Sequence, residues 1–357
     1  MRNLMHCLRD VIIIKKNIVL VFIIAALMAI IVYYGYGGQK FADTQTFQMG
    51  TFVDQKVYGR KCRQAINDVS ARIAEIEQLM TINAPSGEIN ILNEYAGMSG
   101  AKLSPETMQV IEKSIIFSEL SDGAFDITVA PLVKAWGISS ENPTVPEESN
   151  VHNLLKLVNY KDIDISRQEC SVMLKRPGQM VDLGGIAKGY AGDETARIYK
   201  SHGISSGFIN IGGNIVALGN KPDGTPWKVA VKNPRPINEP YIGTIDVNDT
   251  AVATSGDYER FFEHEGKRYH HIIDPKTGYP ADSGLISVTV VAQNSIDADA
   301  LSTALFILGL DKGMRLIRSM PGIEAIFVTK DKKIHVTQGL KQNFIFNTEV
   351  KDFEYVE

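Results

Sequence analysis

The stretch from residue 297 to residue 309, read D-A-D-A-L-S-T-A-L-F-I-L-G, places oxygen-bearing side chains in an otherwise apolar helical pattern. Asp299 and Thr303 are four residues apart, and Asp299 and Ser302 are three apart, so all three can face one spot on a helix. Carboxylate and hydroxyl oxygens are suitable ligands for a hard cation such as Mg²⁺. N-terminal capping is the alternative, since acids are common near helix starts, and it accounts for Asp297 and Asp299. Capping leaves the later hydroxyls unexplained, and this segment alone keeps both interpretations open.

A second group of residues combines glycines with a lysine. Residues 182 to 192 read D-L-G-G-I-A-K-G-Y-A-G, leaving a strand-like V-D-L and entering a helix-like stretch. Glycines let the backbone approach a ligand closely, and a helix N-terminus favours an anion, to which Lys188 adds a positive charge. A tight strand-to-helix turn with a surface lysine is the alternative. The sequence has neither a G-x-G-x-x-G nor a Walker pattern, so a Rossmann site and a P-loop are not indicated.

Two further segments carry acids and imidazoles. Asp126 lies among apolar residues in G-A-F-D-I-T-V, where an acid is more often hydrogen-bonded to the backbone than chemically active. His270 and His271 precede I-I-D-P near a predicted hairpin. Adjacent residues on a strand face opposite ways, so at most one of the two histidines normally points into a given site. This alternation argues against a zinc site built from the pair.

Hydrophobic spacing predicts the helices of the first half of the chain. Apolar residues recur at steps of three and four over residues 66–80, which predicts an amphipathic helix. The sequence S-P-E at residues 104–106 is a good N-cap and first turn for a second helix, which Gly123 ends. A further helix is expected after Pro146.

From residue 207 onward the pattern changes to short strands. These read F-I-N-I-G-G-N-I-V-A-L-G, W-K-V-A-V-K, Y-I-G-T-I-D-V and S-V-T-V-V, with a hairpin around Glu265-Gly266. Helices at 297–309 and 311–319 precede the strands E-A-I-F-V-T and K-I-H-V-T. Helices and strands are mixed without a regular βαβ rhythm, which favours an α+β fold over a doubly wound sheet. We therefore expect one large mixed α/β domain with largely antiparallel sheets.

The composition is that of a globular protein. The chain has 357 residues, of which 44% are hydrophobic and 22% charged, and its formal net charge is −4. With no basic excess, a nucleic-acid partner is excluded. Cys62 and Cys170 could form one disulfide, which the sequence does not decide, and three scattered cysteines exclude a thiolate metal cluster.

The N-terminus predicts a membrane anchor. Residues 18–34 are seventeen uncharged, mostly apolar residues that would give roughly 25 Å of helix, near the lower limit for a bilayer span. Basic residues precede this span, which directs the rest of the chain out of the cytoplasm. No convincing A-x-A site follows, which argues against a cleaved signal peptide. We expect a cytoplasmic basic segment (1–17), a transmembrane anchor (18–34), a tether (35–46) and one extracytoplasmic domain (47–350).

Taken together, seven ordered segments over about residues 47–335 resemble the FAD:protein FMN transferases, the ApbE family. The segments are M-G-T (49–51), G-A-F-D-I-T-V-A-P-L-V (123–133), D-L-G-G-I-A-K-G-Y (182–190), N-I-G-G-N (210–214), A-T-S-G-D-Y (253–258), H-H-I-I-D-P-K-T-G (270–278) and A-D-A-L-S-T-A-L (298–305). Seven motifs in order make the resemblance far more specific than any one of them.

The resemblance implies FAD contacts and a Mg²⁺ site. The implied FAD contacts are Met49, Asn83, Ala124, Phe125, Asp126, Asp182, Lys188 and Ile273. The implied Mg²⁺ ligands are Asp299, Ser302 and Thr303, with the backbone carbonyl of Gly185. The loop after the first helix departs from the family, because it reads N-A-P-S-G-E. Asn83 stands where family members often carry an aromatic residue.

The reaction that the resemblance implies is Mg²⁺-dependent transfer of FMN from FAD to a threonine or serine hydroxyl of an acceptor protein, with release of AMP. The acceptors would be exported flavoproteins, such as subunits of membrane redox complexes. A general base near the acceptor hydroxyl would help, and His271 is the candidate, with ordering of the D-P-K-T-G turn as its alternative role. Rival interpretations are an FAD diphosphatase giving FMN and AMP, and a non-catalytic exported flavin-binding protein.

The anchor and the implied reaction together predict a location. We expect a single-pass protein of the cytoplasmic (inner) membrane, with its catalytic domain on the extracytoplasmic, periplasmic side.

Overall fold

The computed structural model describes residues 23–24, 40–235 and 241–356. The chain divides into two units, residues 1–40 and Phe41–Glu357. The predicted anchor at 18–34 lies almost wholly outside the described residues, so it stays a prediction. Among the residues that are described, none of the helices combines the length and the apolar character that a bilayer crossing requires.

A large sheet forms the centre of the second unit. Within residues 40–235 and 241–356, nine strands follow the order β1-β2-β6-β7-β10-β13-β14-β15-β17. Neighbouring strands are antiparallel except for the parallel pair β15 and β17. The strands are β1 (Phe41–Gln48), β2 (Thr51–Tyr58), β6 (Ser206–Ile211), β7 (Asn214–Leu218), β10 (Thr250–Gly256), β13 (Leu285–Ala292), β14 (Glu324–Thr329), β15 (Lys333–Val336) and β17 (Glu354–Val356).

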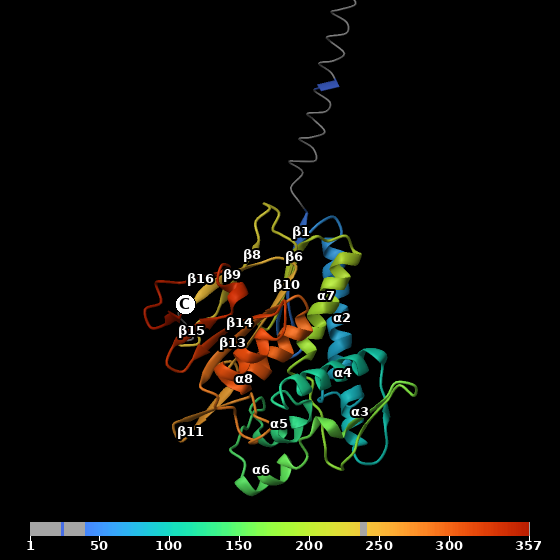
Figure 1. Cartoon of the computed structure of the whole chain (residues 1–357). Coiled ribbons are helices and arrows are strands. Elements are labelled where there is room, and N and C mark those ends of the chain that lie inside the picture. Colours follow the sequence, from blue (N-terminus) through green and yellow to red (C-terminus); the bar gives the residue numbers. More distant parts are fainter. Residues whose placement is uncertain (1–22, 25–39, 236–240, 357) are drawn as a thin grey trace, which may run out of the picture. The chain divides into compact units, whose positions relative to one another are not determined.

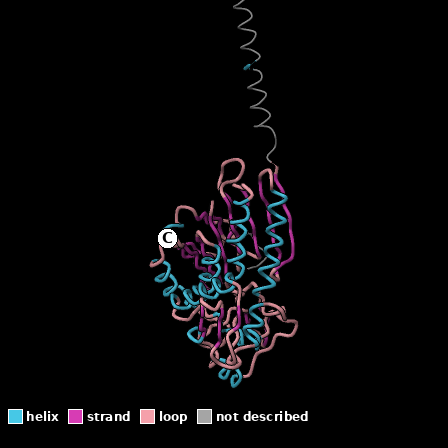
Figure 2. Tube along the Cα trace, turned by 90° about the vertical axis from the view of Figure 1, so that its right-hand side faces the viewer, coloured by secondary structure: helices cyan, strands magenta, loops and turns pink. Residues whose placement is uncertain are grey.

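Three helices pack together against one face of this sheet (Figures 1 and 2). They are α2 (Cys62–Met80), α7 (Ala187–Ser201) and α8 (Ser295–Arg318). The apolar stripe predicted over residues 66–80 is buried along α2, which confirms that helix. The main hydrophobic core lies between the helices and the sheet, and it includes alternate residues of the central strands, such as Ala251 and Ala253 of β10.

The opposite face of the sheet carries a second core. A smaller sheet in the order β16-β9-β8 packs there, formed by β8 (Trp227–Val231), β9 (Gly243–Val247) and β16 (Phe344–Phe346). Val229 and Ile245 of the small sheet share this core with Val252 of β10 and Val291 of β13. The central strands are therefore apolar on both faces, which explains why β13 is buried along its whole length.

Shorter elements build the remainder of the unit. The predicted second helix is α4 (Pro105–Leu120), and Ser104 caps it by accepting from the Thr107 N–H. The helix expected after Pro146 is α6 (Glu148–Leu155), and the hairpin predicted around residues 265–266 is formed by β11 (Phe261–His264) and β12 (Lys267–His270). The unit also contains the helices α3 (Glu88–Glu94) and α5 (Ala130–Trp136). A further sheet in the order β3-β5-β4 is formed by β3 (Ala101–Lys102), β4 (Ile163–Ser166) and β5 (Ser171–Leu174).

The mixed α+β architecture with largely antiparallel sheets agrees with the prediction, but two segments differ from it. The expected tether ended at residue 46, whereas Phe41–Gln48 forms β1 and pairs along its length with β2. Its F-A-D-T-Q-T-F-Q sequence is mostly polar because β1 is an edge strand that is only half-buried on its inner side. The V-D-L at 181–183 is not a strand.

Two other features bear on the predictions. The helices predicted at 297–309 and 311–319 are both present, and α8 is interrupted between them at Gly309, where φ is 78°. Cys62 is buried and Cys170 is exposed, and both thiols are free, so the disulfide that the sequence left open is not formed.

Candidate active site

The Asp299 carboxylate joins the start of α7 to α8. Asp299 lies in the second turn of α8 and is 4% exposed. Its Oδ2 accepts a hydrogen bond from the Gly189 N–H at 2.8 Å, and its Oδ1 lies 3.4 Å from the Lys188 ammonium. Asp299 therefore does not cap its own helix, which removes the simplest alternative to a ligand-binding role.

The N-terminus of α8 is capped from the neighbouring helix instead. Asp193 of α7 accepts hydrogen bonds from the Ser295 N–H at 2.6 Å and from the Ile296 N–H at 3.0 Å. The two helices thus cap each other, since Asp299 of α8 serves the first turn of α7. Burial raises the pKa of Asp193 to about 6, while the two backbone N–H groups oppose that shift.

The glycine-rich turn before α7 brings Lys188 to the same place. The Lys188 ammonium donates to the Gly184 carbonyl at 3.2 Å as well as to Asp299. Asp182 holds the turn, because its Oδ1 accepts from the Gly184 N–H at 2.8 Å. Burial raises the pKa of Asp182, and the Gly184 N–H and the charges of Lys188 and Arg260 counter that effect.

The predicted hydroxyl ligands lie one turn along α8. A Cβ placed on Gly185 would lie 3.6 Å from Thr303 Oγ1 and 3.2 Å from the Phe125 ring, so Gly185, Thr303 and Phe125 are immediate neighbours. Ser302 is buried, and its hydroxyl donates to the Asp299 carbonyl at 2.8 Å. Ser255 of β10 lies beneath both hydroxyls, 2.8 Å from Ser302 Oγ and 3.3 Å from Thr303 Oγ1.

Asp126 has a structural role, as the sequence favoured. Its Oδ1 accepts from the Thr128 N–H at 2.8 Å and from the Thr128 hydroxyl at 2.6 Å, and its Oδ2 accepts from the Tyr160 N–H at 3.0 Å. Burial raises the pKa of Asp126. Both carboxylate oxygens are engaged, so Asp126 holds this loop in place, next to the buried Ala124 and Phe125.

The two adjacent histidines have different surroundings. His270 is buried, and both ring nitrogens are bonded: Nε2 lies 3.0 Å from the Ala281 carbonyl, and Nδ1 accepts from the Ile272 N–H at 3.3 Å. His271 is half-buried, and its Nδ1 lies 3.3 Å from the Arg260 carbonyl. A carbonyl only accepts, so Nδ1 of His271 carries the proton and Nε2 keeps its lone pair. Of the pair, His271 is the one with a nitrogen available to a substrate.

The pKa of His271 is lowered to about 3 in the free protein. Burial is the first cause, and the positive charge of Arg260 adds to it. Arg260 also reaches the β1–β2 turn, where its guanidinium donates to the Gly50 carbonyl at 3.3 Å. Met49 precedes Gly50 in this turn, has a positive φ of 51°, and packs against the main core.

The remaining two predicted FAD contacts lie in other environments. Asn83 is exposed after the end of α2, and its N–H donates to the Thr81 hydroxyl. Ile273 is buried in a satellite core with Leu132, Trp136 and Val151. Their assignment as FAD contacts stays a prediction.

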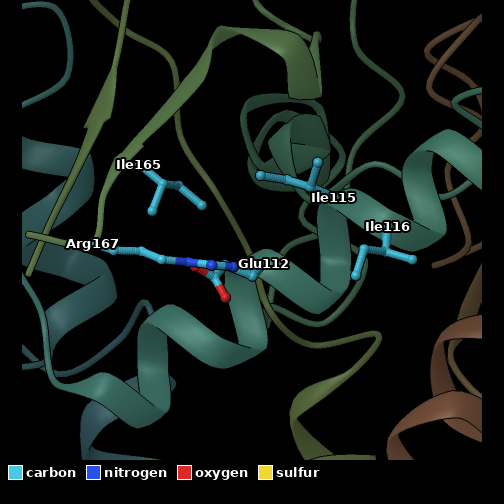
Figure 3. A pocket seen from close by; sticks show the side chains of 5 residues that line it. All are labelled: Glu112, Ile115, Ile116, Ile165 and Arg167. Atoms are coloured by element: carbon cyan, nitrogen blue, oxygen red, sulfur yellow. The ribbon is translucent and has the colours of Figure 1, made fainter.

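Two features of the described part of the chain limit the alternatives. No three His, Cys, Asp or Glu side chains in it come together as a metal cluster, so a cation site around Asp299 would combine one carboxylate with neutral oxygens. A surface cavity on α4 and β4 shares no residue with the predicted site (Figure 3). It is lined by Glu112, Ile115, Ile116, Ile165 and Arg167.

Sequence reasoning did not find Asp193, Ser255 or Arg260. Asp193 lies within a helical pattern, where an acidic residue usually indicates the solvent-exposed face of the helix. Ser255 and Arg260 lie in or just after the motif A-T-S-G-D-Y, so the motif itself was the available signal. Their contacts with residues of distant segments depend on the fold.

A single buried carboxylate, nearby hydroxyls and a lysine at a glycine-rich helix start are typical of proteins that handle a phosphate-bearing ligand. Comparison with known proteins gives the particular family. The ApbE family profile matches residues 49–327, and this chain belongs to the ApbE family.

Relatives of the chain agree with it in length and fold. A protein of Klebsiella pneumoniae named FAD:protein FMN transferase is 36% identical over 76% of this chain and 84% of its own length. A Treponema pallidum protein of the same name is 32% identical over 82% of this chain and 85% of its own. The ApbE protein of Thermotoga maritima has a TM-score of 0.80 at 34% identity, covering 85% of this chain and 99% of its own.

Proposed function

We propose that this chain is an FAD:protein FMN transferase, which moves FMN from FAD to a threonine or serine hydroxyl of an acceptor protein. The observation that carries the proposal is the Asp299 site, where a carboxylate, two hydroxyls and Lys188 from α7 and α8 converge. Relatives that bear this enzyme's name match most of the chain, which supports the same reaction.

The residues present suit a bound Mg²⁺. Its protein ligands would be Asp299, Thr303 and the Gly185 carbonyl, while the buried Ser302 hydroxyl already has two partners, the Asp299 carbonyl and Ser255. Hard oxygen donors of this kind, with few carboxylates, are typical of Mg²⁺ sites completed by substrate phosphates. The Lys188 ammonium lies against the Gly184 carbonyl and Asp299, so these two oxygens already bind one cationic group. Bound Mg²⁺ supplies Lewis acidity that neutralises charge on phosphate oxygens.

The transfer itself is a displacement at phosphorus. The acceptor hydroxyl oxygen forms a bond to the FMN phosphorus of FAD, the bond from that phosphorus to the AMP oxygen breaks, and AMP leaves. The hydroxyl proton goes to a base, for which Nε2 of His271 is the candidate because Nδ1–H is bonded to the Arg260 carbonyl. Lys188 would hold the diphosphate beside Asp299.

Mass spectrometry of an acceptor domain tests the proposal. Purified chain, FAD, Mg²⁺ and a flavoprotein domain with a target threonine should give an acceptor heavier by FMN less one water. Asp299→Ala should abolish the gain and Asp299→Asn should leave little, since a neutral oxygen neutralises less of the cation's charge. Asp297→Ala is the matched control, because Asp297 lies on the same helix but pairs with Lys113. FMN released with an unmodified acceptor, or full activity of Asp299→Ala, would contradict the proposal.

We also propose that the protein is anchored in the cytoplasmic membrane with its catalytic unit outside. The apolar segment at 18–34 and the basic residues before it support this topology. The acceptors would then be exported flavoproteins, such as subunits of membrane redox complexes. External protease added to intact spheroplasts should cleave the catalytic unit, and complete protection would exclude this topology.

A further inference from the structure

The strand that passes beneath the Asp299 site has an unusual pattern of side chains. On β10, the residues that face α8 are Ala251, Ala253 and Ser255, and the two alanines belong to the main core. Such small residues let a helix lie close to a strand. Ser255 ends this series with a hydroxyl on an otherwise apolar face, where a polar group needs a partner.

The contacts of Ser302 fix the direction of the hydrogen bonds. A serine hydroxyl has one proton, and that of Ser302 is donated to the Asp299 carbonyl at 2.8 Å. Ser302 Oγ can therefore only accept from Ser255, which lies 2.8 Å away. Because the Ser255 proton is then used, the contact of 3.3 Å between Ser255 and Thr303 requires that Thr303 donates. The chain runs from Thr303 through Ser255 and Ser302 to the Asp299 carbonyl.

We infer that Ser255 is a positioning residue, which accepts a hydrogen bond from the Thr303 hydroxyl and so turns the Thr303 lone pairs toward the cation. Without this acceptor the Thr303 proton could rotate toward the site, where it would repel the metal. Ser302 then contributes by holding Ser255, and its side chain is not itself a ligand. This inference rests on the proposed function, because it assumes the Mg²⁺ site of Asp299, Thr303 and Gly185.

Metal binding without turnover is the direct test. Mn²⁺ is the probe. The full chain is titrated with Mn²⁺ in the absence of FAD and acceptor, and the electron paramagnetic resonance signal measures the concentration of free Mn²⁺. Ser255→Ala should weaken Mn²⁺ binding on the order of tenfold, the scale for losing a group that orients a metal ligand. Wild-type affinity in Ser255→Ala would overturn the inference.

The same strand offers a matched control. Thr254 faces the other side of the sheet, where its hydroxyl lies 2.9 Å from that of Thr289. Thr254→Val also removes one hydroxyl from β10, and it should leave Mn²⁺ binding unchanged. Equal weakening by Thr254→Val and Ser255→Ala would mean that the loss comes from the strand as a whole, which contradicts the inference.

A double-mutant cycle tests whether Ser255 affects metal binding through Thr303. If Ser255 acts through Thr303, Ser255→Ala should add little to the weakening caused by Thr303→Val. A full tenfold loss in the Thr303→Val background would show that Ser255 acts by itself and would overturn the relay.

Asp299→Ala separates this inference from the proposed function. It should abolish Mn²⁺ binding. If Asp299→Ala loses the metal and Ser255→Ala keeps it, only the inference is wrong. Undiminished binding by Asp299→Ala would instead contradict the metal site of the proposed function, and the inference with it.

Discussion

At the scale of single residues, His270 and His271 show how strongly surroundings decide the role of a side chain. Both nitrogens of His270 are bonded to backbone groups, whereas His271 has one bonded nitrogen and one with a lone pair. Burial and the Arg260 charge keep His271 neutral in the free protein, with a pKa of about 3. The diphosphate of bound FAD is negative and would raise this pKa, which strengthens the base only when the donor is in place.

The lowered pKa of His271 predicts a pH dependence of stability. The pKa is about 3 in the folded protein and 6.5 for a solvated histidine, so the unfolded chain binds more protons between these values. The free energy of unfolding should therefore rise with pH through this window and fall as the pH drops from 6.5 toward 3. His271→Asn should reduce the difference between urea midpoints measured at about pH 7 and about pH 5. His270 retains part of the dependence, because burial lowers its pKa too.

A matched substitution checks that prediction. His152 is exposed on α6, so His152→Asn is the control and should leave the pH dependence as in the wild type. The same dependence in His271→Asn as in the wild type would show that His271 is solvated in the folded protein.

The sequence predicted which residues share a helical face, but it did not predict their contacts. The spacing of Asp299 and Thr303 predicted a shared helical face, and this depends only on helix geometry. The competing capping role could not be settled, because Asp193, which caps α8, comes from a segment about a hundred residues earlier. Ser255 was missed for the same reason, since its partners lie on another element.

At the scale of elements, the crossing of α7 and α8 sets the position of Asp299. Gly189 lies where the helices touch, and a Cβ there would come within 2.5 Å of the Ser295 carbonyl and 2.7 Å of the Asp299 Cβ. The clash with Ser295 is with backbone, which cannot move aside as a side chain can. The reciprocal capping by Asp193 and Asp299 requires this close approach.

Gly189→Ala should separate the two helices and disturb the site. We expect the free energy of unfolding to fall by about 1–3 kcal/mol, the usual cost of overpacking. FMN transfer should fall as well, because Asp299 moves with α8. Gly100→Ala is the control, since a Cβ there would meet its nearest atoms, in Ser171 of β5, at the ordinary contact distance of 3.5 Å. Wild-type activity and urea midpoint in Gly189→Ala would mean that the crossing tolerates an added methyl group.

Periodicity predicted those elements that have one apolar face. The stripe over residues 66–80 was sufficient for α2, whereas β11–β12 was predicted from its turn at residues 265–266. Periodicity did not predict β1, because the outer face of this strand is exposed and its inner face is only half-buried. It also failed for β3 and β17, which are too short to show a period.

At the scale of the whole molecule, the folded unit begins at Phe41, six residues before the predicted start at residue 47. A fragment that begins at residue 47 would lose most of β1 and leave β2 as an unpaired edge next to β6. An exposed edge strand pairs readily with other chains. The fragment 47–357 should therefore have a lower thermal midpoint than 41–357 and should self-associate in light scattering. Equal midpoints and a monomeric 47–357 would show that β1 is dispensable.

The free thiols allow the membrane topology of the protein to be tested by cysteine labelling. Cys170 is exposed in the catalytic unit, whereas Cys62 is buried. Cys7 precedes the apolar segment at 18–34, so the proposed anchor would put it on the opposite side of the membrane from Cys170. A maleimide that cannot cross membranes should thus label intact spheroplasts at Cys170 alone, with Cys7 reacting only after lysis. Because Cys62 is buried, labelling of Cys170 and Cys7 reports the orientation of the native protein.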